Sequence, residues 1–341
     1  MIYTIQFSEL SLQLDMKQFE YIMKNATRLS YVQKFQSDKN VCADISLVKK
    51  GIGIEYHNLK KKKIKLLINP GTLLKNNHSN KPWSLSDKNI SKIIKNLETH
   101  IDEYFNYEIG INDFTLTRFI VTADITFTDK DAIGNYIKVF HGIGKVKGYS
   151  PVKKDGMKNK IERKHAFILL GNSNGIGFFV YSKKAKMNYL NNESVWDDLR
   201  LKQDKSVLRF DSILTSQDVI RSFTDKTITI DRIRSLSFKS TEIFAKCILR
   251  IIPYGEFYKM NEASRIVEEK VKNGTMRRKM LRLLSLIPTK KSLLLAQKAL
   301  GARDIDDIMV EFQDINLSPV CISRRQDVDC LENIYNFLIN D

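Results

Sequence analysis

The first two thirds of the chain alternate between apolar and polar residues in the manner of β-strands. Residues 117–127, TRFIVTADITF, place apolar side chains at every second position from Phe119. The polar side chains of Arg118, Thr122 and Asp124 fall on the opposite face. Alternation of period two gives a strand one apolar face for a core and one polar face that must meet water, a metal or a ligand. Similar patterns predict further strands at residues 2–14, 41–59 (two short strands around Gly51), 64–70, 165–171, 175–184 and 206–214.

Helical spacing of apolar residues appears between these strands and dominates the last third of the chain. Residues 86–105 place an isoleucine- and leucine-rich stripe behind Ser86, a residue typical of a helix N-cap. Further helices are predicted at 15–36, 129–141, 240–251, 261–272, 276–286, 290–300, 304–313 and 328–338, and a basic, glycine-rich loop at 142–164. The pattern indicates an α+β protein, with an antiparallel-sheet domain over residues 1–220 and a helical domain over 221–341. Pro253-Tyr254-Gly255 is a candidate hinge near the boundary.

The composition is typical of a folded cytoplasmic protein. Hydrophobic residues make up 43% of the chain, with 18 Phe and 13 Tyr, which supports a sizeable core and argues against global disorder. No apolar run approaches the roughly 18 residues of a membrane span, and the N-terminal residues lack the features of a signal peptide. The cysteines show no C-x-x-C spacing, which predicts reduced thiols without a zinc site. We therefore expect no membrane partner.

The charge is the first indication of a partner. The chain has 56 Lys and Arg against 39 Asp and Glu, a net charge of +17. Such an excess attracts polyanions, and nucleic acid is the commonest polyanionic partner of a cytoplasmic protein. A lysine-rich composition typical of an AT-rich genome would give the same excess without such a role. The segment GIGKVKG (142–148) lacks the spacing of a Walker loop, which argues against nucleotide hydrolysis.

Three of the predicted strands carry charged residues or a tyrosine on one face, opposite large apolar residues on the other. If these strands pair in one antiparallel sheet, that face gathers six side chains: Arg118, Asp124, Tyr181, Lys183, Arg209 and Asp211. The alternative is structural, because Arg and Asp on the wet face of a sheet often pair across strands and do nothing else. Tyr181 would then cap an aromatic core.

These residue types would suit phosphoryl transfer. Asp124 and Asp211 could hold a divalent cation, Mg²⁺ or Mn²⁺, which takes oxygen ligands and stabilises charge on a phosphoryl group. The oxygen of Tyr181 can form a covalent intermediate, and the lysine and arginines of the same face would position the phosphate. The reaction implied is transesterification, in which tyrosine attacks a DNA phosphate and leaves a free 3′-hydroxyl.

The order of these segments resembles the replication proteins of filamentous phages, the gene II/gene X type of rolling-circle initiator, and related plasmid proteins. The landmarks follow an opening hydrophobic strand: TRFIVTADI (117–125), FFVYSKK (178–184), LRFDSIL (208–214), YGEFYKMNEASRIVEEK (254–270) and NLSPVCI (316–322). The resemblance implies a sequence-specific nickase that starts rolling-circle replication by a metal-assisted tyrosine attack. It also implies DNA as the partner, single-stranded or as an origin hairpin, a host helicase as a further partner, and the cytoplasm of a bacterial host cell as the location.

Several positions depart from the family pattern. Ile120 stands where the Arg-Ile-Asp motif has its aspartate, and Asp211 replaces a glutamate. Leu169 and Leu170 stand near a position where related initiators often carry a tyrosine. The 5 histidines are isolated in the sequence, so a histidine metal site of the common nickase kind is not predicted.

Two hypotheses for the function remain open at this point. The first is a working nickase with Tyr181, or as the less favoured choice Tyr189, as the nucleophile. The second is a degenerate initiator that binds DNA without cutting it. The retained tyrosine and aspartates favour the first hypothesis, and the isoleucine and leucine departures favour the second. An RNA-binding sheet ranks last, because the clustered aromatic residues of that class are missing.

The helical end carries its own candidates for DNA contact. TMRRKMLRLLSLIP (275–288) arranges basic residues around an apolar stripe, and two lysines follow the tyrosine strand. We expect the following residues to contact phosphates: Lys184, Lys186, Arg277, Arg278, Lys279 and Arg282. Residues 292–319 predict two short helices around Gly301, either as a helix-turn-helix or, the favoured alternative, as plain bundle packing.

Overall fold

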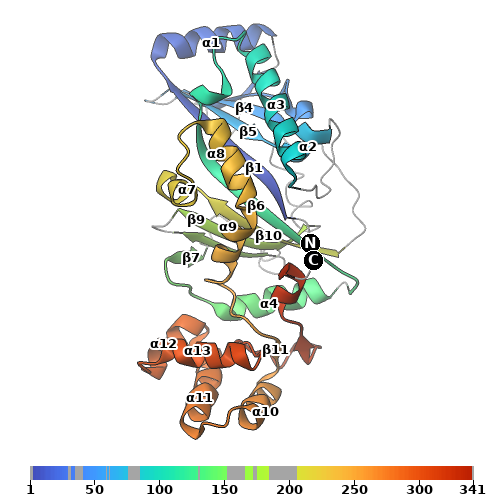
Figure 1. Cartoon of the computed structure of the whole chain (residues 1–341), viewed down its shortest axis with the longest axis vertical. Coiled ribbons are helices and arrows are strands. Elements are labelled where there is room, and N and C mark those ends of the chain that lie inside the picture. The colour runs from blue at the N-terminus through green and yellow to red at the C-terminus, as the bar shows by residue number, and fades with distance from the viewer. Residues whose placement is uncertain are drawn as a thin grey trace.

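Among the described residues, ten strands form one antiparallel sheet that is the frame of the protein (Figure 1). The computed structural model describes residues 3–29, 32–34, 41–58, 60, 62–75, 85–129, 131–151, 166–171, 175–183 and 206–339. The strands run across the sheet in the order β2-β3-β4-β5-β1-β6-β10-β9-β8-β7. Their bounds are β1 (Tyr3–Leu14), β2 (Val32–Lys34), β3 (Val41–Asp44), β4 (Ile52–Asn58), β5 (Lys62–Ile68), β6 (Thr115–Phe127), β7 (Tyr149–Pro151), β8 (Ala166–Gly171), β9 (Ile176–Ser182) and β10 (Ser206–Leu214).

Helices cover the apolar face of this sheet. Alternation places Phe210 of β10 on that face, and its ring lies 6.2 Å from Phe140 and 6.4 Å from Phe244, measured between ring centroids. These two residues belong to α4 (Ala132–Ile143) and α9 (Ser240–Ile248). Over the other half of the sheet lies α3 (Asp87–Tyr104), whose stripe of isoleucine and leucine is buried. Ser86 caps α3 as predicted, because its hydroxyl accepts a hydrogen bond from the Asn89 amide at 3.3 Å.

The remaining helices are shorter or lie in the C-terminal part of the chain. They are α1 (Met16–Leu29), α2 (Pro70–Lys75), α7 (Gln217–Phe223), α8 (Thr229–Phe238), α10 (Met260–Lys270), α11 (Gly274–Lys290), α12 (Leu293–Leu300), α13 (Ile305–Asp314) and α14 (Ile334–Ile339). A small hairpin pairs β11 (Phe257–Tyr258) with β12 (Cys330–Leu331). Among the described helices, none is both long and apolar enough to cross a membrane.

The structure confirms the α+β fold class, with an antiparallel sheet in the N-terminal part and mostly helices after it. Three local predictions were wrong. The helix expected at 15–36 ends at Leu29 and a short strand, β2, follows it. The loop expected at 142–164 contains β7. The helix expected at 328–338 begins only at Ile334, and β12 occupies part of the expected range before it. β2 pairs with the next strand, β3, and β7 pairs with β8, whereas β12 pairs with β11, about 70 residues earlier. Each of these short strands depends on a partner strand that the pattern of its own few residues does not report.

After residue 220, the chain first packs against the sheet, then forms a cluster of helices, and finally returns to the sheet near its C-terminus (Figure 1). Thr229 of α8 donates a hydrogen bond to the carbonyl of Phe114. Near the C-terminus, the ring of Phe337 in α14 lies 5.4 Å from that of Phe127 at the end of β6. Between these two contacts, α10, α11, α12 and α13 gather in the lower part of Figure 1. The boundary between the two domains, expected at residue 220, stays a prediction.

The candidate hinge at residues 253–255 is firmly packed. Gly255 has a φ of +118°, and a Cβ at this position would lie 2.3 Å from the carbonyl carbon of Leu317. On either side of this contact, the Glu256 amide donates to Asn316 at 3.0 Å and the Ser318 amide donates to Glu256 at 2.8 Å. The segment is thus tied by its backbone to residues 316–318.

Candidate functional site

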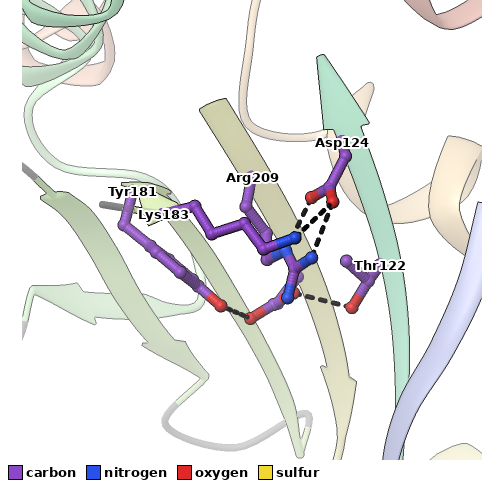
Figure 2. A network of polar contacts seen from close by, with 6 residues as sticks. Thr122, Asp124, Tyr181, Lys183 and Arg209 are labelled. Carbon is purple, nitrogen blue, oxygen red and sulfur yellow. Dashed lines mark hydrogen bonds and ion pairs between the residues drawn. The ribbon is translucent and has the colours of Figure 1, made fainter. Parts of the chain in front are cut away.

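The polar constellation predicted from three strands forms on one face of the sheet, where β6, β10 and β9 are neighbours. Arg209 lies opposite Asp124 in the β6–β10 pair, and Asp211 lies opposite Thr122. In the β9–β10 pair, Arg209 lies opposite Tyr181. Because side chains directly opposite each other point to the same face, the register brings these groups together. Figure 2 shows Thr122, Asp124, Tyr181 and Arg209 side by side with Lys183, which directly follows β9.

Asp124 is the centre of a cluster of opposite charges (Figure 2). The Arg209 guanidinium donates to both carboxylate oxygens, from Nε to Oδ1 and from Nη2 to Oδ2, each at 2.6 Å. The Lys183 Nζ lies 3.3 Å from Oδ2. Burial on its own would raise the pKa of Asp124, but the hydrogen bonds and charge of Arg209, with those of Lys183, hold that pKa below its ordinary value. Asp124 is therefore ionised and balanced by two cations.

Tyr181, Asp211 and Thr122 form a second, adjoining cluster. The Tyr181 hydroxyl donates to Asp211 Oδ2 at 2.7 Å, and the Thr122 hydroxyl donates to Oδ1 at 2.7 Å. Tyr181 and Asp211 are each only 5% exposed, and Thr122 is fully buried. Burial, followed by the negative charge of Asp211, raises the pKa of the Tyr181 phenol well above its ordinary value. The tyrosine is therefore held as a neutral hydrogen-bond donor.

Arg118 is the one predicted member that the sheet places elsewhere. It lies on β6 six residues before Asp124, a separation of about 20 Å along a strand. Its Nη1 donates to Glu9 Oε1 of β1 at 2.9 Å, and Lys65 of β5 lies 2.7 Å from the other oxygen of Glu9. The expectation that Arg118 joins the Asp124 cluster is thus not met. Glu9 was missed because its pairing depends on β1 lying between β5 and β6, which no local pattern indicates.

The two aspartates are fully engaged by protein donors in this arrangement. Each of the four carboxylate oxygens of Asp124 and Asp211 accepts a hydrogen bond from a side chain. A divalent cation would bind both aspartates only after Arg209, Lys183 or the hydroxyl donors moved away. Within the described part of the chain, no group of three or more His, Cys, Asp or Glu side chains is placed to hold a metal. The use of Mg²⁺ or Mn²⁺ stays a prediction.

The positions that depart from the initiator pattern are apolar in their surroundings as well. Ile120 is buried and lies opposite Ile213, so an apolar pair interrupts the polar face between Thr122 and Arg118. Leu169 is fully buried opposite Phe178, on the helix-covered face. The backbone of Leu170 lies opposite Gly177. Tyr189, Lys184 and Lys186 fall outside the described residues.

The basic residues of α11 differ in their surroundings. Arg278 and Arg282 are exposed, and Arg278 donates to the Gly274 carbonyl at 3.2 Å. Lys279 lies 2.5 Å from Asp304, the N-cap residue of α13, so it connects two helices. Arg277 is half-buried. The structure thus presents two of the four as outward-facing cations.

The two short helices predicted around Gly301 are present as α12 and α13. Gly301 ends α12 with a φ of +65°, a conformation that glycine adopts without strain. Ala296 of α12 and Ile308 and Phe312 of α13 are fully buried. These inward-facing residues show helix packing; a role for the pair in reading a DNA groove stays a prediction.

Comparison of the sequence with protein-family models gave no match, and comparison with curated proteins gave none either. Among solved structures, the chain is similar to the rolling circle replication initiator protein from Geobacillus stearothermophilus, with a TM-score of 0.35 and 10% sequence identity. The alignment covers 95% of this chain and 99% of that chain. Similarity of this degree does not assign a family, and the resemblance to the gene II/gene X type stays a prediction.

Proposed function

We propose that the protein binds DNA at a replication origin as an initiator of the rolling-circle kind, and that its sheet constellation stabilises the fold without cutting DNA. The proposal that the constellation does not cut DNA rests on the burial of Tyr181, which is 5% exposed and donates a hydrogen bond from its hydroxyl to Asp211. A nucleophile must place its oxygen within about 3–3.5 Å of the phosphorus that it attacks. A covered phenol with a raised pKa is unsuited to that step.

The charge balance of the constellation also supports a structural role without DNA cutting. A phosphate would need positive charge that is not already balanced. Both oxygens of Asp124 accept hydrogen bonds from Arg209, and Lys183 lies beside them. With the adjoining Asp211, two carboxylates face two cations, so the constellation as a whole is close to neutral, and a DNA phosphate gains little from approaching it.

DNA binding is supported by the charge distribution elsewhere in the chain. The net charge is +17, and residues 270–303 contain no aspartate or glutamate. This stretch spans α11 and α12, where Arg278 and Arg282 are exposed. A long segment whose charges are all of one sign is the electrostatic footprint of a phosphate-binding protein.

The second candidate is a working nickase, and the Tyr181–Asp211 hydrogen bond favours it. In the nicking step, the Tyr181 oxygen would form a bond to phosphorus while the bond from phosphorus to the 3′-oxygen breaks. The phenolic proton would pass to Asp211, which already accepts it in a hydrogen bond of 2.7 Å, and the leaving 3′-oxygen would take a proton from water. This candidate requires a movement that uncovers Tyr181.

A nicking assay separates the two candidates. The protein is incubated with supercoiled plasmid carrying the DNA that adjoins its gene, with Mg²⁺, Mn²⁺ or EDTA, and covalent protein–DNA adducts are sought in denaturing gels. We expect retarded DNA, no relaxed circles and no adduct. Adducts that vanish in Tyr181→Phe but persist in Tyr136→Phe, a buried tyrosine that donates to the Glu332 carbonyl, would establish the nickase. Absence of any DNA retardation at low salt would overturn both candidates.

A further inference from the structure

Two basic segments that are far apart in the sequence are joined by a close backbone contact. The loop between α4 and β7 meets the junction between α11 and α12 at Gly144, which has a φ of +67°. A Cβ at Gly144 would lie 2.3 Å from the carbonyl oxygen of Lys291 and 2.7 Å from the Cα of Ser292. Only glycine allows so close an approach in this conformation.

Hydrogen bonds hold the same contact together. The Lys145 amide donates to Ser292 Oγ at 3.0 Å, and the Ser292 hydroxyl lies 3.3 Å from the Lys145 carbonyl. Ser292 also caps α12, because its Oγ accepts from the Leu295 amide at 3.4 Å. The position of the loop relative to the helical cluster is therefore fixed at this point.

The contact brings four lysines to one place: Lys145, Lys147, Lys290 and Lys291. All four are exposed, and none forms an ion pair within the described part of the chain. Neither segment offers an acidic neighbour, since residues 132–154 and 270–303 contain no aspartate or glutamate. Lys291 has a φ of +52° at the end of α11, where glycine or asparagine is usual, so a cation stands at a position that favours other residues.

The same positive charge continues along α11. Arg278 and Arg282 are four residues apart and therefore neighbours on one side of the helix. Lys290 lies eight residues after Arg282 and is turned about 80° from it around the helix axis. Twelve residues of helix span about 18 Å, roughly five base-pair steps of duplex DNA. The exposed arginines and Lys290 thus form a band of positive charge that winds part of the way around α11 towards the contact.

We propose that Lys145, Lys147, Lys290 and Lys291 form a single phosphate-contacting surface, which we call the junction surface, and that it extends the basic side of α11 onto the sheet. Its partner is the sugar-phosphate backbone of DNA, because lysines act as point charges that attract phosphates without reading bases. The proposal rests on the proposed DNA binding and adds where the backbone lies: across the contact between the helical cluster and the sheet.

Salt dependence of DNA binding tests the junction surface. Fluorescence anisotropy with a 30-bp duplex of arbitrary sequence is measured between about 50 and 200 mM salt for the full chain. The variant replaces the four lysines with glutamine. The matched control replaces Lys17, Lys88, Lys92 and Lys95, exposed lysines of α1 and α3, and changes the net charge equally. The slope of log K against log salt is negative, and each lost phosphate contact should make it shallower by about 0.9.

We expect the slope to become shallower by about 2–4 in the junction variant and by less than about 1 in the control variant. Equal losses in both variants would show a general charge effect and overturn the junction surface. An unchanged slope in the junction variant, with the unaltered protein still binding, would overturn it while leaving the proposed function intact. Failure of the unaltered protein to bind the duplex at low salt would overturn both, and tight binding of poly-glutamate instead would point to an acidic protein partner.

A second variant tests the geometry without changing charge. Gly144→Ala should push the loop away from Lys291 and lower DNA affinity several-fold, although every lysine is retained. Ser292→Ala removes the cross-segment hydrogen bonds without adding bulk and should give a smaller loss in the same direction. Circular dichroism and thermal unfolding check that both variants fold. Folded Gly144→Ala protein with unaltered affinity would contradict the idea that the contact assembles the surface.

Discussion

Arg209 and Asp124 face each other across the β6–β10 pair and share two hydrogen bonds of 2.6 Å. Their side chains are only 6% and 10% exposed. A two-pronged arginine–carboxylate pair of this kind is among the stronger polar contacts in proteins. Removing both charges from water is nevertheless costly, so the pair stabilises the fold only while both partners are present.

The first prediction follows from this dependence of each partner on the other. Arg209→Met should lower the free energy of unfolding by about 3–5 kcal/mol, because Asp124 keeps its buried charge with only Lys183 beside it. The double variant Asp124→Leu/Arg209→Met should recover much of that loss. Urea unfolding followed by circular dichroism gives both values. Asp124→Leu alone completes the set, and a loss in the double variant equal to the sum of the losses in the two single variants would mean that the pair is not coupled.

The second prediction concerns acid. The folded-state pKa of Asp124 lies below its ordinary value of 3.8, so the unfolded chain binds more protons than the folded one in that range. The contribution of Asp124 to stability is therefore complete above the ordinary pKa and is lost as the pH falls through the lower folded value. We expect the urea midpoint to decline from about pH 5 downwards. Asp124→Asn should flatten that decline.

Glu9 offers an internal comparison for the acid experiment. Burial would raise its pKa, but Lys65 and Arg118 together lower it below the ordinary value. Glu9→Gln should therefore also flatten the decline, at a site about 20 Å from Asp124 by strand geometry. If neither substitution changed how steeply the urea midpoint declines with falling pH, the acid sensitivity would arise from other carboxylates.

Some of this architecture is readable in the sequence, and some is not. The polar face of β6 was predictable because strand side chains alternate with a period of two. That Arg209 stands opposite Asp124 was not, because register depends on tertiary pairing rather than on local pattern. The same reason explains why Arg118 was expected beside Asp124 but lies with Glu9 of β1. Burial of Tyr181 was also hidden, since alternation assigns a face but not what covers it.

The third prediction compares two glycines. Gly255→Ala should destabilise the protein by several kcal/mol, because the φ of +118° suits only glycine and the new Cβ would lie 2.3 Å from the Leu317 carbonyl carbon. Gly134→Ala, inside α4 with no neighbouring atom within 4 Å, should instead stabilise it by about 0.5–1 kcal/mol. Thermal unfolding of both variants measures the difference. Similar melting temperatures for the two would contradict the tight packing at residues 253–255.

The last prediction separates two roles within α11. Lys279 is engaged with Asp304 at 2.5 Å, whereas Arg278 and Arg282 are exposed. Arg278→Gln/Arg282→Gln should weaken DNA binding across all sequences and lower the slope of log K against log salt by about 1–2, with little change in stability. Lys279→Gln removes one charge but mainly loosens α11 from α13, so it should lower stability by up to about 1 kcal/mol and change the slope less. Anisotropy titrations measure the salt slope, and urea unfolding of the same preparations measures the stability. A larger change of slope in Lys279→Gln than in the arginine variant would mean that the ion pair opens when DNA binds and that α11 meets the duplex through its inward edge.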